Sequence, residues 1–502
     1  MGGLTLISRI LGFIRDVVIA HTFGAGISTD AFLVAFKIPN FMRRLFAEGA
    51  FSQAFVPILS EYKTQRDAIA VRHLVARVIG NLGGLLLLIT FIGVGIAPLL
   101  VLIFAPGFIQ HQEKYNLTVA MLQITFPYLL FIALTALAGA VLNTYGRFAI
   151  PAITPVLLNI CLIGAAVWFA PRFEQPVMAL AWGVFIAGIV QLSFQLPFLY
   201  RLNLLPKPNF NWHDEGIQRI RQLMIPALFG VSVSQINLLI DTLMASFLVT
   251  GSVSWLYYSD RLMEFPVGVF GLALATVMLP NLSKAVARDD MHTYINTLDW
   301  ALRWVFLIAI PAMLGLITLA KPMLVTLFHS GAFSENDVIM TARSLVAYSL
   351  GLLGFVLIKV LASGFYSRQD TRTPVKIAII AMTANMLLNF SLIWSLQHAG
   401  LALATSLAAL LNAGLLYRGL RQQDVFQPQP GWDKFLLRIV IASSGMAILL
   451  WWGSGNLSVW LNMGTLERAW HLFSWIGAGM LVYVVSLIIL GFRWHHISLQ
   501  ER

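Results

Sequence analysis

Residues 76–105 read ARVIGNLGGLLLLITFIGVGIAPLLVLIFA, and no charged side chain follows Arg77 in this run. The hydrocarbon core of a bilayer is about 30 Å thick, and a helix needs roughly 20 apolar residues to cross it. A run of this length and composition therefore predicts a helix that spans a membrane.

The rest of the chain has the same character. Of its 502 residues, 58% are hydrophobic and only 11% are charged, whereas about a quarter of the residues of soluble domains are charged. A single water-soluble fold is therefore excluded. Fourteen apolar windows, bounded by polar residues, Pro or Gly, lie at 4–20, 29–60, 76–105, 117–143, 150–170, 177–200, 218–247, 252–281, 298–328, 338–364, 374–396, 399–417, 434–453 and 468–492. They predict an all-α polytopic membrane protein with about 14 transmembrane helices.

Basic residues in the connections predict the orientation of the chain. The connections after the even-numbered windows, together with the C-terminus, hold nineteen of them, and the opposite set holds four: Lys114, Arg172, Lys321 and Arg468. Cytoplasmic loops carry an excess of Lys and Arg, so both termini are expected on the cytoplasmic side. The same excess accounts for the net charge of +11, and no nucleic-acid partner is expected.

The chain also repeats itself. Three short patterns recur in the same order at offsets of 225, 223 and 221 residues: positions 16 and 26 at 241 and 251, 57–60 at 280–283, and 145–147 at 366–368. This spacing corresponds to six helices, which preserves orientation. We therefore expect two parallel six-helix lobes, residues 1–205 and 206–425, around a central cavity, with helices 13 and 14 in residues 426–502. Such an arrangement is typical of transporters.

Three helices carry charged residues inside the membrane. At 100° per residue, polar residues on each of these helices share one face. They are Arg9 and Asp16 on the first helix, with Arg15 adjacent; Asp30, Lys37, Arg44 and Glu48 on the second, with Arg43 adjacent; and Ser254, Arg261 and Glu264 on the eighth, with Asp260 adjacent. A charge at the bilayer centre costs ~2.5–3.5 kcal/mol on insertion scales. The set therefore indicates a polar cavity, or else ion pairs such as Arg9 with Asp16 and Arg261 with Glu264.

Ion pairing alone does not account for this set, because its six basic residues exceed its five acidic ones. A guanidinium group binds phosphate oxygens bidentately. The expected ligand is therefore an anion that carries phosphate.

A second set of polar residues supplies oxygen atoms. Asp241 lies within helix 7, Asn385 and Asn389 lie one turn apart on helix 11, and Thr405 lies on helix 12. Four such donors would suit Na⁺, or Asp241 alone could carry a proton; hydrogen bonds between helices are the alternative. No cofactor is expected, since the chain has one cysteine and no phosphate-binding G-x-x-x-x-G-K-[ST] motif.

Four runs, 8–16 (SRILGFIRD), 37–40 (KIPN), 43–51 (RRLFAEGAF) and 257–266 (YYSDRLMEFP), resemble the MurJ (MviN) family of lipid II flippases, and the similarity extends over essentially the whole chain. One departure is that this chain begins almost inside its first helix, where family members have several more residues. The resemblance implies a fourteen-helix member of the multidrug/oligosaccharidyl-lipid/polysaccharide exporter superfamily. It also implies transport of an undecaprenyl-diphosphate-linked peptidoglycan precursor from the cytoplasmic to the periplasmic leaflet of the bacterial inner membrane.

The resemblance further implies roles for particular residues. Arg9, Arg15 and Arg261 match positions that line the cavity and bind the diphosphate, Asp30 matches a required position, and helices 13 and 14 match a groove for the polyprenyl tail. On this basis we expect a monomer that works by alternating access without chemical conversion of its substrate. The remaining charged residues would form gating ion pairs, membrane potential would help to reset the empty cavity, and the cell-wall synthesis machinery is a candidate partner.

Two other functions fit the sequence less well. An exporter of O-antigen lipids or of cationic drugs would share the fold, but a site for cationic drugs should be acidic. A membrane-embedded glycan polymerase would need an essential acid outside the membrane, for which the candidates are Glu113, Glu174, Glu335 and Asp337.

Overall fold

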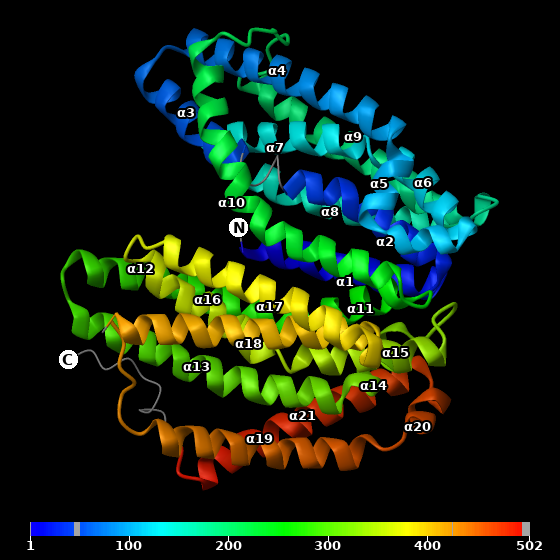
Figure 1. The fold of residues 1–502 in the computed structure, drawn as a ribbon, viewed down its shortest axis with the longest axis vertical. Coiled ribbons are helices and arrows are strands. Elements are labelled where there is room, and N and C mark those ends of the chain that lie inside the picture. Colours follow the sequence, from blue (N-terminus) through cyan, green and yellow to red (C-terminus); the bar gives the residue numbers. More distant parts are fainter. Residues whose placement is uncertain (1, 45–50, 424, 494–502) are drawn as a thin grey trace. The chain divides into compact units, whose positions relative to one another are not determined.

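The computed structural model describes residues 2–44, 51–423 and 425–493, which form helices joined by short connections (Figure 1). No strand occurs within these ranges, so the all-α prediction is confirmed. Eleven helices of the described part are long and apolar enough to cross a membrane. The protein is thus a multi-pass membrane protein, while the count of fourteen spans stays a prediction.

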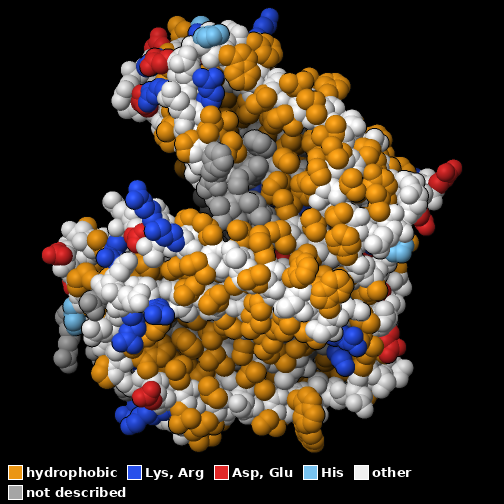
Figure 2. Space-filling model, viewed as in Figure 1, with side chains coloured by type: hydrophobic (Ala, Val, Ile, Leu, Met, Phe, Trp, Pro, Cys, Tyr) orange, Lys and Arg blue, Asp and Glu red, His pale blue; other side chains and the backbone are white. Residues whose placement is uncertain are grey.

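The chain packs as two compact units, Met1–Ser254 and Trp255–Arg502. The lobes predicted from the sequence repeat, 1–205 and 206–425, and the separate segment 426–502 stay predictions. On the face shown in Figure 2, hydrophobic side chains cover the middle of each unit, and charged side chains gather toward the ends of its helices. Side chains that face lipid need no water, which explains the apolar surface.

The first unit contains most of the shorter helices. Its elements are α1 (Gly2–Phe23), α2 (Ile27–Arg43), α3 (Ser52–Gln65), α4 (Ala68–Gly95), α5 (Ala97–Phe104), η2 (Pro106–Gln110), α6 (Gln112–Thr125), α7 (Tyr128–Thr144), α8 (Ala149–Gly164), η3 (Ala165–Phe169), η4 (Ala170–Arg172), α9 (Met178–Arg201) and α10 (Glu215–Ser246). The predicted window 76–105 is divided between α4 and α5, and Pro98 lies at the start of α5. Proline is tolerated there because the first N–H groups of a helix have no partner within it.

The core of the first unit explains why α10 belongs to it. Side chains of α3, α4, α7 and the end of α9 form one buried apolar cluster, which includes Phe55, Leu74 and Leu142. Ile217 and Ile220, at the start of α10, are buried in the same cluster. Burial of such side chains stabilises by about 1.5–3 kcal/mol each, so this end of α10 is firmly packed against α3.

The second unit begins within α11 (Ser252–Pro266), which starts in the first unit. It continues with η5 (Val267–Gly271), α12 (Leu272–Ala287), α13 (Met291–Thr318), α14 (Ala320–Phe328), α15 (Glu335–Ser349), α16 (Leu352–Tyr366), α17 (Arg372–Leu396), α18 (His398–Gln422), α19 (Trp432–Ser454), α20 (Leu457–Asn462) and α21 (Thr465–Ile489). Helix α19 packs against α21 and α13, and α17 packs against α18.

A buried ion pair fastens the start of α19 to α13. Arg303 Nε donates to Asp299 Oδ2 at 2.7 Å. The other carboxylate oxygen, Asp299 Oδ1, accepts from Trp432 Nε1 at 2.7 Å and from the backbone N of Gln429 at 3.1 Å. The Arg303 guanidinium also lies 5.2 Å from the centre of a Trp432 ring. One carboxylate thus connects the segment before α19 to α13.

Asp299→Ala tests this connection. The variant leaves Arg303 buried without its carboxylate, and removal of one partner of a buried pair costs about 3–5 kcal/mol. We therefore expect a clearly lower melting temperature of the protein in detergent. Asp433→Ala is the control, because Asp433 directly follows Trp432 in the chain but is exposed. Equal melting temperatures of the two variants would contradict the connection.

Candidate functional site

Arg15 is buried within the first unit and held by two partners. Its side chain on α1 donates from Nη2 to Asp16 Oδ1 at 2.6 Å and from Nη1 to Asn159 Oδ1 on α8 at 3.0 Å. The Asn159 side chain in turn donates to the backbone carbonyl of Ser8 at 3.1 Å. Arg15 is 7% exposed, whereas Arg9, two turns earlier, is exposed. The structure therefore pairs Asp16 with Arg15, where the sequence suggested Arg9, and these hydrogen bonds fix the direction of the Arg15 guanidinium group.

Asp30 is a carboxylate of the predicted set that binds both a lysine and backbone N–H groups. It is fully buried near the start of α2. Its Oδ1 accepts from Ser254 N at 2.9 Å and from Ser254 Oγ at 2.6 Å, and its Oδ2 accepts from Gly251 N at 2.8 Å. Lys114 Nζ donates to the same Oδ2 at 2.6 Å. Asp30 thus joins α2 to Gly251, just before α11, and to Ser254 in the first turn of α11. The contact brings together two predicted residues, Asp30 and Ser254.

Lys114 was not among the predicted site residues. It was one of the four basic residues on the predicted outer side of the membrane, where such residues are uncommon. Two of those four, Lys114 and Arg468, are buried at 2% and 9% exposed, whereas Arg172 and Lys321 are exposed. A basic residue on the unfavoured side was therefore a usable signal, but its partner could not be read from the sequence.

The other charged residues of α2 lie further along this helix. Lys37 Nζ donates to Thr242 Oγ1 on α10, the neighbour of Asp241. Arg43 Nε donates to Asn40 Oδ1 at 2.8 Å, and Arg44 is exposed at the end of the helix. Glu48 lies outside the described residues. Lys37 thus gives α2 a polar contact with α10, separate from the contact of Asp30 with Gly251 and Ser254.

Arg261 lies on α11, and its charge is only partly covered. Arg261 Nη1 lies 3.0 Å from Glu264 Oε2, with the two side chains 38% and 54% exposed. The guanidinium group also lies over the Tyr257 ring at 5.0 Å from its centre. Asp260, the preceding residue, is half-buried. In contrast to Arg15, Arg261 keeps an accessible surface that an anion could contact.

The predicted cation ligands lie in both units. Asn385 and Asn389 are buried one turn apart on α17, and Thr405 Oγ1 on α18 donates to the Leu401 carbonyl at 3.0 Å. Asp241 lies on α10 of the first unit and is half-buried. Among the described residues, no group of three or more His, Cys, Asp and Glu side chains could hold a metal ion. The four oxygen donors stay a predicted site.

Three ion pairs connect the start of α10 to the rest of the first unit. Arg219 binds both oxygens of Glu61 on α3, at 2.8 and 2.7 Å. Arg66 lies 3.3 Å from Glu215, and Arg77 pairs with Asp214. The hydrogen bond from Arg219 lowers the pKa of Glu61 below its ordinary value. Ion pairs therefore hold the start of helix α10. At its end, the Gly107 N–H group donates to Ser246 Oγ at 3.0 Å.

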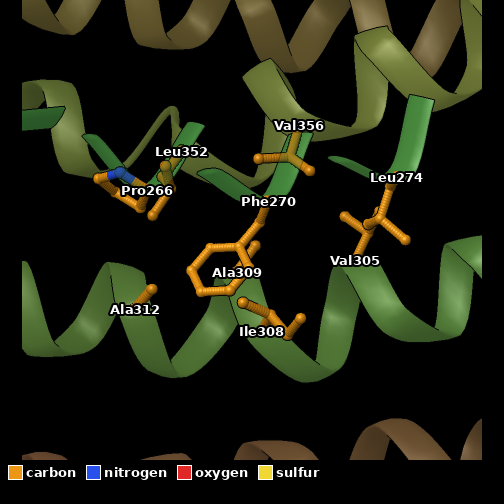
Figure 3. A pocket seen from close by; sticks show the side chains of 9 residues that line it. All are labelled: Pro266, Phe270, Leu274, Val305, Ile308, Ala309, Ala312, Leu352 and Val356. Atoms are coloured by element: carbon orange, nitrogen blue, oxygen red, sulfur yellow. The ribbon is translucent and has the colours of Figure 1, made fainter. Parts of the chain in front are cut away.

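One pocket of the second unit is entirely apolar. It lies where α11, the π-helical turn η5 and α12 pass α13 and α16 (Figure 3), and it is lined by Pro266, Phe270, Leu274, Val305, Ile308, Ala309, Ala312, Leu352 and Val356. These side chains offer no hydrogen bond and no charge. A charged or polar ligand group would find no partner in this pocket.

Comparison with known proteins gives consistent matches over the chain. The family model described as "Lipid II flippase MurJ" matches residues 19–469. A Vibrio cholerae protein named "Probable lipid II flippase MurJ" is 50% identical over 98% of this chain and 95% of its own length. A Burkholderia cenocepacia protein named "Lipid II flippase MurJ" is 44% identical over 98% of this chain and 97% of its own length.

Solved structures agree with these matches. A structure titled "Lipid II flippase MurJ, inward closed conformation" is similar with a TM-score of 0.80 and 29% identity, over 97% of this chain and 98% of that one. An inward-facing multidrug resistance transporter of the MATE family has a TM-score of 0.68 and 14% identity, over 83% of this chain and 95% of that one. At 14% identity, the second match concerns the fold alone.

The Glu61–Arg219 pair predicts a dependence of stability on pH. Because the pKa of Glu61 is lowered from 4.5 in the folded protein, its stabilisation is fully present above that value and is lost as the pH falls through the lower folded-state value. At pH 7 we expect Glu61→Gln to lower the melting temperature by about 1 °C, since exposed pairs contribute little. The difference from the unmodified protein should shrink below pH 4.5. A difference that is constant with pH would contradict this prediction, and Glu113→Gln, at an exposed position, is the control.

Proposed function

The chain belongs to the MurJ family of lipid II flippases, and we propose that it moves lipid II from the cytoplasmic to the periplasmic leaflet of the bacterial inner membrane. The substrate is a polyprenyl diphosphate that carries a muropeptide. Its transport needs a site for the anionic diphosphate, a path for the tail that stays in lipid, and a way to close each side of the membrane in turn.

The observation that carries the anionic site is the distribution of charge around Asp30. Lys114, which lies outside the predicted cavity set, neutralises this carboxylate at 2.6 Å. Asp30 is therefore not available to balance the basic residues of α1, α2 and α11, and their surplus is larger than the sequence count indicated. Arg15, held by Asp16 and Asn159, and the partly exposed Arg261 are the proposed diphosphate contacts, together with Arg9.

Alternating access would use the contacts of α10 and α11 as gates. In the described conformation, Asp30 joins α2 to Gly251 and Ser254. We propose that these bonds close the periplasmic end and break when it opens, while Lys37, Arg43, Arg44, Glu48, Asp260 and Glu264 exchange partners during the cycle.

The tail and the termini complete the proposal. Helices α19 and α21 present large exposed side chains, among them Trp451, Trp452 and Trp470, which suit a hydrocarbon chain along their surface. We propose that both termini lie in the cytoplasm, and that the protein acts as a monomer that contacts the cell-wall synthesis machinery. Labelling of single cysteines from each side of the membrane tests the orientation.

A polymerase is less well supported than a transporter. Of its four candidate acids, Asp337 is buried and accepts a hydrogen bond from Trp255 Nε1 at 2.9 Å while it caps α15. Its carboxylate therefore has a structural role. Glu113, Glu174 and Glu335 are exposed, where a general acid lacks the environment that raises its pKa. We therefore propose transport without chemical conversion.

Arg261→Ala tests the diphosphate site. The assay uses cells depleted of their native flippase and an externally added enzyme that cleaves lipid II. Expression of the unmodified chain should restore the cleavage that depletion removes. We expect the Arg261→Ala variant to restore less than a tenth of this cleavage, since a lost contact with a charged group costs about 1.5–3 kcal/mol. Arg288→Ala, at an exposed position on the connection after α12, should restore it fully.

Two results would count against these assignments. Full restoration by Arg261→Ala, with the protein present in the membrane, would remove α11 from the headgroup site. Cleavage that does not change on depletion would instead favour an exporter of O-antigen-type lipids.

Coupling to a cation is a separate proposal for Asp241, Asn385, Asn389 and Thr405. We expect a Na⁺ gradient to accelerate transport in vesicles severalfold, and Asp241→Asn to remove this response while leaving transport driven by the substrate gradient. A response to a proton gradient instead would assign Asp241 as a proton carrier. No response to either ion would leave membrane potential as the driving force, worth ~2.3 kcal/mol per charge per 100 mV, and would overturn the cation site.

A further inference from the structure

Lys114 is an ammonium group in a place that disfavours one. It lies on α6, is 2% exposed, and belongs to the predicted outer side of the membrane, where basic residues are few. Its Nζ lies 2.6 Å from Asp30 Oδ2 and 4.1 Å from the centre of the Phe108 ring. Burying an ammonium group is unfavourable unless it is paired. A buried lysine at this position therefore suggests that its positive charge has a specific role.

The Asp30 carboxylate has two kinds of partner. On one side is Lys114, whose helix α6 packs along α2 and is tied to it again by Thr125 Oγ1, which donates to the Ala35 carbonyl at 3.0 Å. On the other side are the three donors of Gly251 and Ser254. Lys114 is therefore expected to stay with α2 when Gly251 and Ser254 move away from Asp30.

We propose that Lys114 is a positioning residue for this gate: its ammonium group holds the Asp30 carboxylate in place to receive the donors of Gly251 and Ser254. A single carboxylate accepts four hydrogen bonds here, and a buried carboxylate without a counter-charge is unfavourable. Without the charge at position 114, Asp30 would turn toward water or accept fewer bonds. The closed end of the transporter should therefore open more often.

This inference rests on the proposed function for the meaning of the gate, but its test does not require lipid II. Ser252 lies between the two donor residues, is 1% exposed, and its hydroxyl group makes no hydrogen bond in the described structure. In a Cys161→Ala background, which removes the only native cysteine, Ser252→Cys provides a single thiol. Its reaction with a membrane-impermeant maleimide, added to right-side-out vesicles, measures how often this end opens.

Lys114→Met removes the charge and keeps most of the side-chain volume. We expect the labelling rate of the thiol introduced by Ser252→Cys to rise at least tenfold, and lipid II transport to fall in the same variant. Lys321→Met is the matched control, because Lys321 lies on the same predicted side of the membrane but is exposed. It should change neither quantity. Labelling of the Lys114→Met variant at the unmodified rate would overturn the proposal.

Charge is separated from packing by two further variants. Lys114→Arg keeps the positive charge, and Lys114→Gln keeps a hydrogen-bond donor without it. We expect slow labelling of the Lys114→Arg variant and fast labelling of the Lys114→Gln variant. This comparison tests the proposal even if the Lys114→Met variant fails to accumulate. Equal labelling of these two variants would show that charge is not what Lys114 supplies, and would overturn the proposal.

Asp30→Asn connects the two residues. If Lys114 acts through Asp30, the combined Lys114→Met and Asp30→Asn variant should label no faster than the faster single variant, because residues that act together are not additive. Multiplied effects would mean that they act independently and would contradict the inference. If labelling responds as expected while lipid II exposure does not depend on the protein, the proposed substrate fails and the gate remains.

Discussion

Pairing of buried charges is the constraint on which the rest of this structure depends. The bilayer interior contains no water to solvate an ion, and a charge that loses its partner there is strongly destabilising. Arg15 with Asp16, Lys114 with Asp30, and Arg303 with Asp299 each approach within 2.7 Å or less. The Lys114–Asp30 pair joins α6 to α2. The other two pairs each lie on one helix, and a further hydrogen bond joins each of them to a neighbouring helix: Arg15 donates to Asn159 on α8, and Trp432 on α19 donates to Asp299.

The buried basic residues differ in what surrounds them, and this difference separates structure from function. Arg468 donates to the backbone carbonyls of Trp460, Leu461 and His329 at 2.8–3.1 Å. Backbone carbonyls cannot rotate away as a side chain can, so Arg468 joins α20, α21 and the end of α14. Lys114 instead binds a carboxylate that also accepts from a different segment. A carboxylate shared in this way can lose one set of donors and keep the other, which a gate requires.

The sequence predicted what depends on local composition and missed what depends on distant contacts. Uninterrupted apolar runs predicted helices because the bilayer imposes the same length on each span. The breaks inside the windows were not predicted: 76–105 became α4 and α5, and 252–281 became α11, η5 and α12. Proline residues were visible at both places, but whether a helix bends, ends or widens there depends on its neighbours. Asp30 was selected from its place among charged residues, whereas Asn159, a common polar residue 144 positions from Arg15, carried no signal.

Basic residues on the predicted outer side of the membrane carry information that composition alone does not. The excess of Lys and Arg on the cytoplasmic side follows from topology, so an individual loop arginine there carries little information about function. A lysine on the other side opposes that tendency. Where such a residue is exposed, as Lys321 is, the cost is small because water solvates it. Where it is buried, as Lys114 and Arg468 are, both the orientation rule and desolvation oppose it, and only a specific partner compensates. The two buried residues both join separate segments of the chain. Lys114 does so by binding the carboxylate of Asp30, and Arg468 by binding backbone carbonyls.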